Sequence, residues 1–232
     1  MQRSIVNNLA FFDEKFAGWS GVARRTAAVY GLPDPMQYLE HPWRPDRWRS
    51  HCRKVISDFW DQKLRAEARP RSSSQFADVD SLSTTVPMRI WQQAGINSVS
   101  VKQATIVSWM YCGTYFTREL MHTMHKVKSS GCACNSEISE DIPHILLHCQ
   151  LYSSIREEYI PKFIQMNSKI QEICDNENLL VISILDPLSS KLPHSITANW
   201  TSVSGVYELA RKLCYRMHSK REKIYIDLDN TL

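Results

Sequence analysis

The sequence predicts a mainly α-helical fold, with a small CCHC zinc-knuckle-like lobe inserted between helices. First, apolar residues recur at every third or fourth position over several long stretches, which is the period of one helix face. Second, polar segments rich in serine, glycine and proline divide these stretches. Third, one such polar segment, residues 130–150, holds three of the seven cysteines of the chain.

The 232 residues, of which 43% are apolar, are enough to bury the core of one domain or of two small ones. Composition and period divide the chain into four regions. They are a basic and aromatic helical region at 1–70, a serine-rich linker at 71–86, a helical region at 87–165 that contains the zinc lobe at 130–150, and a C-terminal helical region at 166–232.

The strongest helix prediction covers residues 46–64. Asp46 follows Pro45 and is a candidate N-cap. Trp43, just before this helix, would either pack against it or offer an exposed surface on which a nucleic-acid base could stack. The positions expected on one buried face are Trp48, Cys52, Val55, Ile56, Phe59, Trp60 and Leu64.

The rest of the chain continues this helical pattern. Residues 71–85 predict a flexible connection, because they are polar and rich in serine. The apolar run 179–185 is too short to distinguish a buried strand from a helix. His122 and His125 fall on one of the predicted helices and are expected to be surface or partly buried residues. Further helices are predicted at 87–93, 101–111, 116–127, 151–163 and 203–217.

The polar segment 130–150 carries the pattern C-x-C-x9-H-x4-C. Thiolate sulfur and imidazole nitrogen suit Zn²⁺, which four such ligands can enclose in a tetrahedron. Unmetallated cysteines that are buried as small apolar groups are the alternative. That alternative fits Cys132 and Cys134 poorly, because their neighbours have loop composition with little apolar surface. The predicted ligands of a closed, structural zinc site are Cys132, Cys134, His144 and Cys149.

The fourth ligand depends on local helix geometry. Asp141-Ile142-Pro143 is typical of a helix start. In a regular helix His144 and His148 share a face, whereas His144 and Cys149 diverge by about 140°. Cys149 can bind only if the helix loosens at its end, and His148 is the alternative ligand. We favour Cys149, since residues 150–152 indicate a break before the next helix.

Basic residues gather in two stretches, 42–71 and 211–223, although the net charge of the chain is only +4. Such clusters neutralise phosphates and release counterions, which favours RNA or DNA as the partner. Solvated helix faces are the alternative. The side chains predicted to contact nucleic acid are Arg44, Arg47, Arg49, Arg53, Lys54, Arg65, Arg69, Arg216, Lys220 and Arg221.

The residues around the cysteines also carry a family resemblance. The run Cys132-Ala-Cys134, Glu140, His144 to Cys149, Leu151-Tyr152 and Arg156 resembles the C-terminal zinc-binding region of non-LTR retrotransposon reverse transcriptases. The resemblance extends more loosely over about residues 25–160. It implies a tail segment of an endonuclease–reverse transcriptase polyprotein, with the reverse transcriptase domain as its partner and a zinc region that helps to hold nucleic acid. Upstream, the similar parts are Tyr30-Gly-Leu-Pro33, the helix at 48–64, Lys102-Gln-Ala-Thr and Tyr111-Cys-Gly-Thr-Tyr115.

No catalytic residues are predicted. A polymerase carries its metal-binding carboxylates on an aromatic-x-Asp-Asp hairpin. In Phe76-Ala-Asp78-Val-Asp80 the two aspartates are separated and flanking apolar strands are lacking, so the segment is interpreted as a loop. Asp227 and Asp229 begin a D-x-D-x-T sequence that resembles the first motif of haloacid-dehalogenase-type phosphatases, but no later motif follows to complete a site. We therefore expect a binding module; the competing hypothesis is a protein-interaction remnant of a mobile element, fastened by zinc.

Cysteine usage favours a reducing intracellular compartment, the nucleus or the cytoplasm. Seven is an odd number, and the spacing suits metal binding better than disulfides. The N-terminus lacks the uninterrupted apolar stretch of a secretory signal. The longest apolar run, 179–185, is far shorter than the ~20 residues of a membrane helix. We expect a protein that is not secreted and has neither a membrane nor a small-molecule partner.

Overall fold

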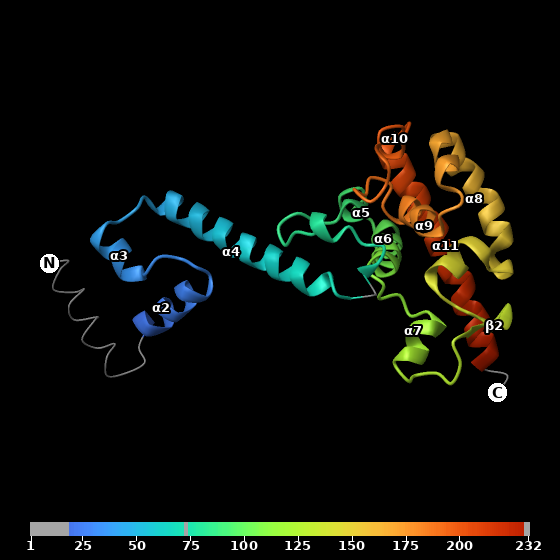
Figure 1. Ribbon diagram of the computed structural model, residues 1–232, viewed down its shortest axis with the longest axis horizontal. Coiled ribbons are helices and arrows are strands. Elements are labelled where there is room, and N and C mark those ends of the chain that lie inside the picture. Colours follow the sequence, from blue (N-terminus) through green and yellow to red (C-terminus); the bar gives the residue numbers. More distant parts are fainter. Residues whose placement is uncertain (1–18, 72–73, 230–232) are drawn as a thin grey trace. The chain divides into compact units, whose positions relative to one another are not determined.

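The computed structural model describes residues 19–71 and 74–229, and over these residues the protein is mainly helical, as predicted. Two compact units are present (Figure 1). Unit 1 comprises the described residues up to Ala66 together with Ser83–Val86, and unit 2 comprises Glu67–Leu82 and the described residues from Pro87 onward. Among the described residues, no helix is long and apolar enough to cross a membrane.

Unit 1 contains the helices α2 (Trp19–Val29) and α3 (Pro35–Glu40) and most of α4 (Pro45–Ala68). Helix α2 ends where Gly31 adopts a positive φ of 68°. The Gly31 amide donates to the Ala28 carbonyl, and the Leu32 amide donates to the Ala27 carbonyl at 2.8 Å. These two hydrogen bonds form the Schellman pattern. Glycine suits this position because the left-handed region costs it little.

Aromatic side chains pack α4 against the two shorter helices. Tyr30 lies edge-on to Phe59, with ring centroids 5.0 Å apart, and Tyr38 lies 3.9 Å from Trp48. The expectation of a fully buried face on α4 is wrong, since none of its residues is buried and Trp60 remains 41% exposed. The two short helices of unit 1 offer too little surface to cover a helix of 24 residues.

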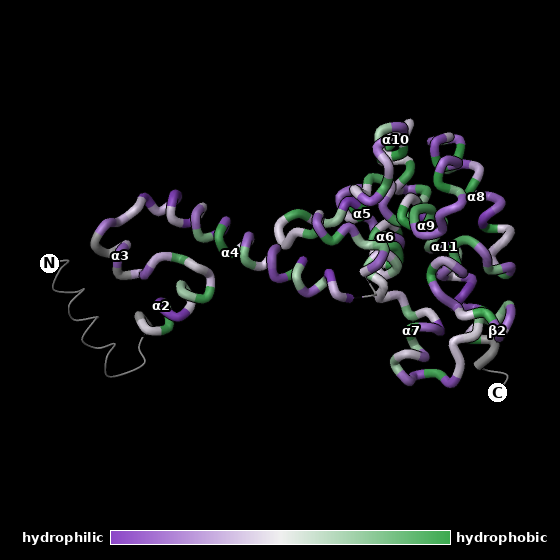
Figure 2. The backbone as a smooth tube through the Cα atoms, viewed as in Figure 1, coloured by the Kyte–Doolittle hydropathy of each residue, from purple (hydrophilic) through white to green (hydrophobic). Residues whose placement is uncertain are grey.

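The core of unit 2 forms where α6 (Ser98–Tyr111), α9 (Glu177–Leu185) and α11 (Val203–Asp229) meet. Figure 2 shows hydrophobic residues concentrated in this part of the unit. The predicted apolar stripe of α11 is confirmed at four positions that are fully buried: Val206, Ala210, Leu213 and Met217. Surrounding these helices are α5 (Arg89–Gln92), α7 (Arg118–Thr123), α8 (Ser153–Met166), α10 (His194–Thr197) and the antiparallel strands β1 (Gly131–Cys132) and β2 (Asn135–Ser139).

Three local features differ from the sequence-based expectations or resolve them. The run 179–185 is a helix, which the Asn176 side chain begins by accepting from the Leu179 amide. The helix expected at 116–127 shortens to α7, because His125 has a positive φ of 56° just beyond it. Asp227 and Asp229 lie at the end of α11 instead of at a strand end, so the phosphatase-like motif lacks its required setting.

Residues 74–85 of the serine-rich segment are not the flexible connection that the sequence predicts. Phe76 is only 1% exposed and belongs to the core of unit 2. The Asp78 amide donates to Tyr111 Oη at 2.7 Å, while in unit 1 the Thr84 amide donates to the Asp61 carboxylate at 2.6 Å. The segment from residue 74 to Leu82 therefore belongs to unit 2, and Ser83–Val86 belong to unit 1.

A buried carboxylate, Asp186, joins several elements of this core. It accepts hydrogen bonds from Tyr207 Oη at 2.5 Å and from Tyr111 Oη at 3.3 Å, and pairs with Arg89 at 3.2 Å. These partners come from α11, α6 and α5. Regions 87–165 and 166–232 thus share one core and one polar network.

We predict that Phe76→Ala lowers the free energy of unfolding of unit 2 by about 3–5 kcal/mol, because it leaves a cavity in a closed core. Ile96→Ala is the matched control, since Ile96 is fully exposed, and we expect it to change stability by less than about 0.5 kcal/mol. Denaturant unfolding followed by circular dichroism measures both. Equal stability of the two variants would restore the linker interpretation of residues 71–85.

Candidate metal centre

The structure brings together the four residues predicted as metal ligands. The ligand atoms of Cys132, Cys134, His144 and Cys149 all lie within 4.8 Å of one another. Cys132 Sγ is 3.6 Å from Cys149 Sγ, and Cys134 Sγ is 3.3 Å from His144 Nε2. Cys132, His144 and Cys149 are buried and Cys134 is half-buried. A metal ion could bind between these four side chains.

A tight hairpin presents the first two cysteines. Cys132 ends β1, Asn135 begins β2, and these two residues pair across the turn. Gly131 has to be a glycine here, since a Cβ atom at that position would lie 2.2 Å from the Ser136 carbonyl oxygen. The close approach of the strands turns Cys132 and Cys134 toward the same point despite the single residue between them.

A π-helical turn, η3 (His144–His148), presents the other two ligands. The Asp141 carboxylate caps its start by accepting from the His144 amide at 2.7 Å. At its end the Cys149 amide donates to the His144 carbonyl at 2.7 Å, an i→i+5 hydrogen bond. This wider turn brings residues five apart to the same side of the backbone, which a regular α-helix does not do. The loosening that Cys149 requires is therefore present.

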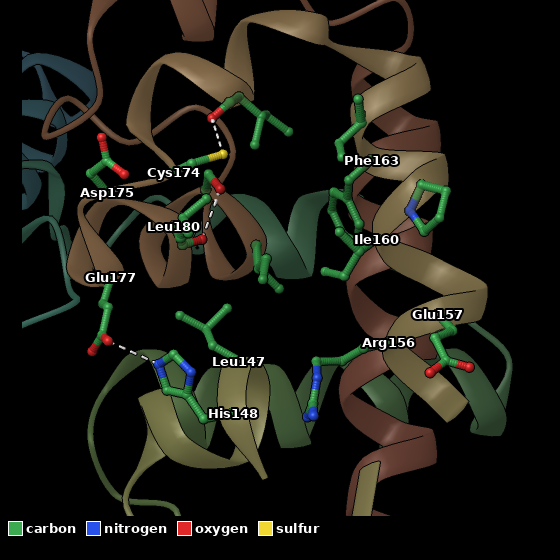
Figure 3. Close-up of a pocket in the computed structure, with 15 residues that line it drawn as sticks. Leu147, His148, Arg156, Glu157, Ile160, Phe163, Cys174, Asp175, Glu177 and Leu180 are labelled. Carbon is green, nitrogen blue, oxygen red and sulfur yellow. Dashed lines mark hydrogen bonds and ion pairs between the residues drawn. The ribbon is translucent and has the colours of Figure 1, made fainter. Parts of the chain in front are cut away.

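His148, the alternative ligand, lies outside the cluster. Its side chain is half-exposed, and Nε2 pairs with the Glu177 carboxylate at 2.9 Å. This pair lines a cavity of about 610 Å³. Figure 3 shows Leu147 beside the pair and Ile160 and Phe163 on the opposite wall. His148 and Leu147 thus face this cavity, while His144 and Cys149 face Cys132 and Cys134 on the other side of the turn.

The arrangement passes a simple geometric test for four-coordinate binding. Sulfur at ~2.3 Å and nitrogen at ~2.0 Å from a tetrahedral ion place two sulfurs roughly 3.8 Å apart and a sulfur and a nitrogen roughly 3.5 Å apart. The observed separations of 3.6 Å and 3.3 Å are close to these values. All four ligand atoms lie within 4.8 Å of one another, so an ion would draw the more distant ligands closer.

Burial favours the neutral forms of three of the four groups. It raises the pKa of the Cys132 and Cys149 thiols and lowers the pKa of His144. These directions favour the protonated thiol of each cysteine and the neutral imidazole. Metal binding must displace the thiol protons, so the affinity for metal falls as the pH decreases.

A neighbouring arginine supports the π-helical turn. Arg156 donates to the Cys149 carbonyl at 2.6 Å and more weakly to the Ile145 carbonyl at 3.4 Å. The Cys149 carbonyl also accepts from the Tyr152 amide at 3.1 Å, so Arg156 adds a second donor where the turn ends. Arg156, which belongs to the resemblance in sequence, is thus a positioning residue for Cys149.

A second positioning group joins the hairpin to α11. Glu140 is 1% exposed and accepts from Arg221 Nε at 2.7 Å and from Tyr225 Oη. Tyr225 Oη in turn accepts from the amide of Ala133, which lies between the two cysteines of the hairpin, at 3.3 Å. Tyr225 was not identified from the sequence. The i,i+4 spacing of Arg221 and Tyr225 shows that they share a helix face, but no local signal reveals a partner more than 80 residues away.

The predicted nucleic-acid-binding residues separate into two groups. The prediction that Arg221 contacts nucleic acid is wrong. Its side chain is buried against the Glu140 carboxylate at 2.5 Å and is not available for a phosphate. Arg216 pairs with Glu158, Arg69 pairs with Asp80 at 2.7 Å, and Lys220 is half-buried. In unit 1 Arg65 is half-buried, and the exposed residues of the predicted set are Arg44, Arg47, Arg49, Arg53 and Lys54.

Comparison of the chain with family models finds no match. Neither a curated protein nor a solved structure matches it significantly. The function is therefore argued from the chemistry of the site and from the resemblance in sequence.

We predict that Cys149→Ser removes bound metal, whereas His148→Gln retains about one equivalent per chain. Only the first variant removes a sulfur atom of the cluster. The second removes the half-exposed imidazole that contacts Glu177. Elemental analysis of the purified, dialysed proteins measures the outcome. Loss of metal from His148→Gln with retention in Cys149→Ser would reverse the ligand assignment.

We predict that Glu140→Gln lowers the free energy of unfolding by about 3 kcal/mol, because it leaves the buried Arg221 guanidinium without its counter-charge. Glu158→Gln removes the carboxylate of an exposed pair with Arg216 and should have little effect. Thermal and denaturant unfolding of the metal-loaded proteins compare the two. A larger effect of the exposed substitution would show that Glu140 does not fasten the hairpin to α11.

Proposed function

We propose that this chain is a zinc-binding and nucleic-acid-binding module from the C-terminal part of a non-LTR retrotransposon reverse transcriptase. The observation that carries the proposal is the convergence of three thiols and one imidazole within 4.8 Å. Soft sulfur donors in a tetrahedral setting favour Zn²⁺ over the hard ions Mg²⁺ and Ca²⁺.

The proposed role of zinc is structural. Four protein ligands leave no open position for water or a substrate. Zinc would convert the hairpin and the π-helical turn, which together hold few buried apolar residues, into one rigid lobe. We assign no reaction to this chain, because the predicted ligand set contributes no catalytic group.

The distribution of charge supports nucleic acid as the partner. Between residues 44 and 54, four arginines and one lysine are opposed by one aspartate, so this segment has a net charge of +4 (5 − 1) when histidine is neutral. The whole chain has the same net charge, so the remaining residues sum to zero. Among the described residues, none of these five cations forms an ion pair with a carboxylate. An exposed, uncompensated cluster of this kind binds phosphates through counterion release.

The assignment to a reverse transcriptase tail rests on the resemblance. The motif C-x-C-x9-H-x4-C, followed by an aromatic residue and Arg156, carries it. The supporting geometry is that Arg156 contacts the backbone of the fourth ligand, which gives the motif's arginine a physical role. In this proposal the partner domain is the reverse transcriptase of the same polyprotein, and the module acts in the nucleus or cytoplasm.

One observation favours the alternative of a protein-interaction remnant fastened by zinc. Several basic residues of unit 2 are engaged within the protein: Arg221 with Glu140, Arg216 with Glu158 and Arg69 with Asp80. In this alternative the exposed cations of α4 are only a solvated helix face. The two functions differ in whether the chain retains nucleic acid at low salt.

We predict that the full chain binds RNA or DNA with an affinity that falls steeply with salt. The double substitution Arg49→Gln/Arg53→Gln should reduce the slope of log K against log[salt] by about 2, one unit for each lost phosphate contact. Arg216→Gln is the control, because this arginine is already paired. Filter binding over a salt series measures the slopes, and no retention by the wild-type chain at low salt would favour the protein-interaction alternative.

A further inference from the structure

A hollow lies beside the cationic segment of unit 1. It has a volume of about 360 Å³ and is formed by α3, the residues that precede it and the connection to α4. Aromatic and proline side chains provide much of its wall, which is typical of sites that take flat rings. The lining residues are Pro33, Gln37, Tyr38, His41 and Trp43.

Trp43 is held in place and still accessible at this hollow. Its ring meets Tyr38 edge-on, with centroids 5.3 Å apart, and lies 5.3 Å from His51. The Arg47 guanidinium lies over the ring at 4.7 Å. Despite these contacts, Trp43 is 37% exposed. Its position is thus fixed by packing, and an incoming ring needs little reordering of the side chain.

Positive charge continues along α4 from the edge of this hollow. Arg44 and Arg47 flank Trp43, and a second hollow of about 270 Å³ follows, lined by Asp46, Arg49, Ser50 and Arg53. Arg49 and Arg53 are four residues apart, so they share one helix face and lie about 6 Å apart along the axis. That spacing allows these two side chains to meet successive phosphates of one strand.

We propose that the hollow at Trp43 binds an unpaired base of a single-stranded nucleic acid, while Arg49 and Arg53 contact the phosphates that follow it. This inference rests on the proposed nucleic-acid-binding function and specifies its substrate class. A base inside a duplex is stacked on both faces and cannot enter, so the site discriminates single strands from duplexes. Stacking on an aromatic ring is tolerant of sequence, since every base has a flat face.

Trp60 provides a matched control within the same unit. It is 41% exposed, and the Lys63 ammonium lies over its ring at 5.0 Å. Trp60 therefore shares the exposure and the cation contact of Trp43, but it does not line the hollow. A difference between the two tryptophans isolates the contribution of the hollow itself.

The test uses the full chain with three labelled probes: a short single strand, its duplex, and the same strand with abasic sugars throughout. Trp43→Ala should weaken binding of the single strand by about tenfold and leave binding of the duplex and the abasic strand unchanged. Trp43→Phe should retain most of the affinity, and Trp60→Ala all of it. In the wild-type chain, a 2-aminopurine placed in the single strand should lose fluorescence on binding, a readout that does not depend on folding of a variant.

Equal loss of affinity for all three probes in Trp43→Ala, or unquenched 2-aminopurine on the bound wild-type chain, would overturn the stacking site and leave the nucleic-acid-binding function standing. Failure of the wild-type chain to bind any probe at low salt would instead overturn the proposed function, and the inference with it. Preferential binding of an acidic aromatic peptide over the single strand at the Trp43 hollow would also overturn the inference.

Discussion

The cluster of three cysteines and one histidine depends on one backbone hydrogen bond, from the Cys149 amide to the His144 carbonyl. Because this bond spans five residues, it widens the turn and places imidazole and thiol on one side. A regular α-helix would have directed His148 toward the cluster instead. Asp141 at the start and Arg156 at the end stabilise the wide turn through hydrogen bonds that involve no metal ion.

The lobe formed by the hairpin and this turn is fastened to the helical core of unit 2. Glu140 and Tyr225 provide the connection, since together they contact the backbone between the two hairpin cysteines and the buried Arg221 of α11. The middle of α11, at Val206, Ala210, Leu213 and Met217, lies in the core, so one helix contacts both the lobe and the core. The basic cluster that the sequence places at 211–223 is in part this structural connection, whereas the uncompensated charge is on α4 in unit 1.

Period and spacing predicted the long helices and the four residues that the structure brings together, because both are local properties of the sequence. The stripe from Val206 to Met217 and the four cluster residues are examples. The burial of Phe76 could not be predicted, since its polar neighbours suggest a loop and its contacts are distant in sequence. The prediction that Arg221 contacts nucleic acid was wrong for the same reason. A charged residue on a helix is expected to be exposed unless its buried partner, here Glu140, is known.

We propose that three sulfurs and one nitrogen of this chain close a four-coordinate metal site. X-ray absorption at the zinc edge of the metal-loaded protein measures that donor set directly. We expect three sulfurs at about 2.3 Å and one nitrogen at about 2.0 Å, with no oxygen ligand. A first shell with two sulfurs or with bound water, or a protein that takes up no zinc, would contradict it.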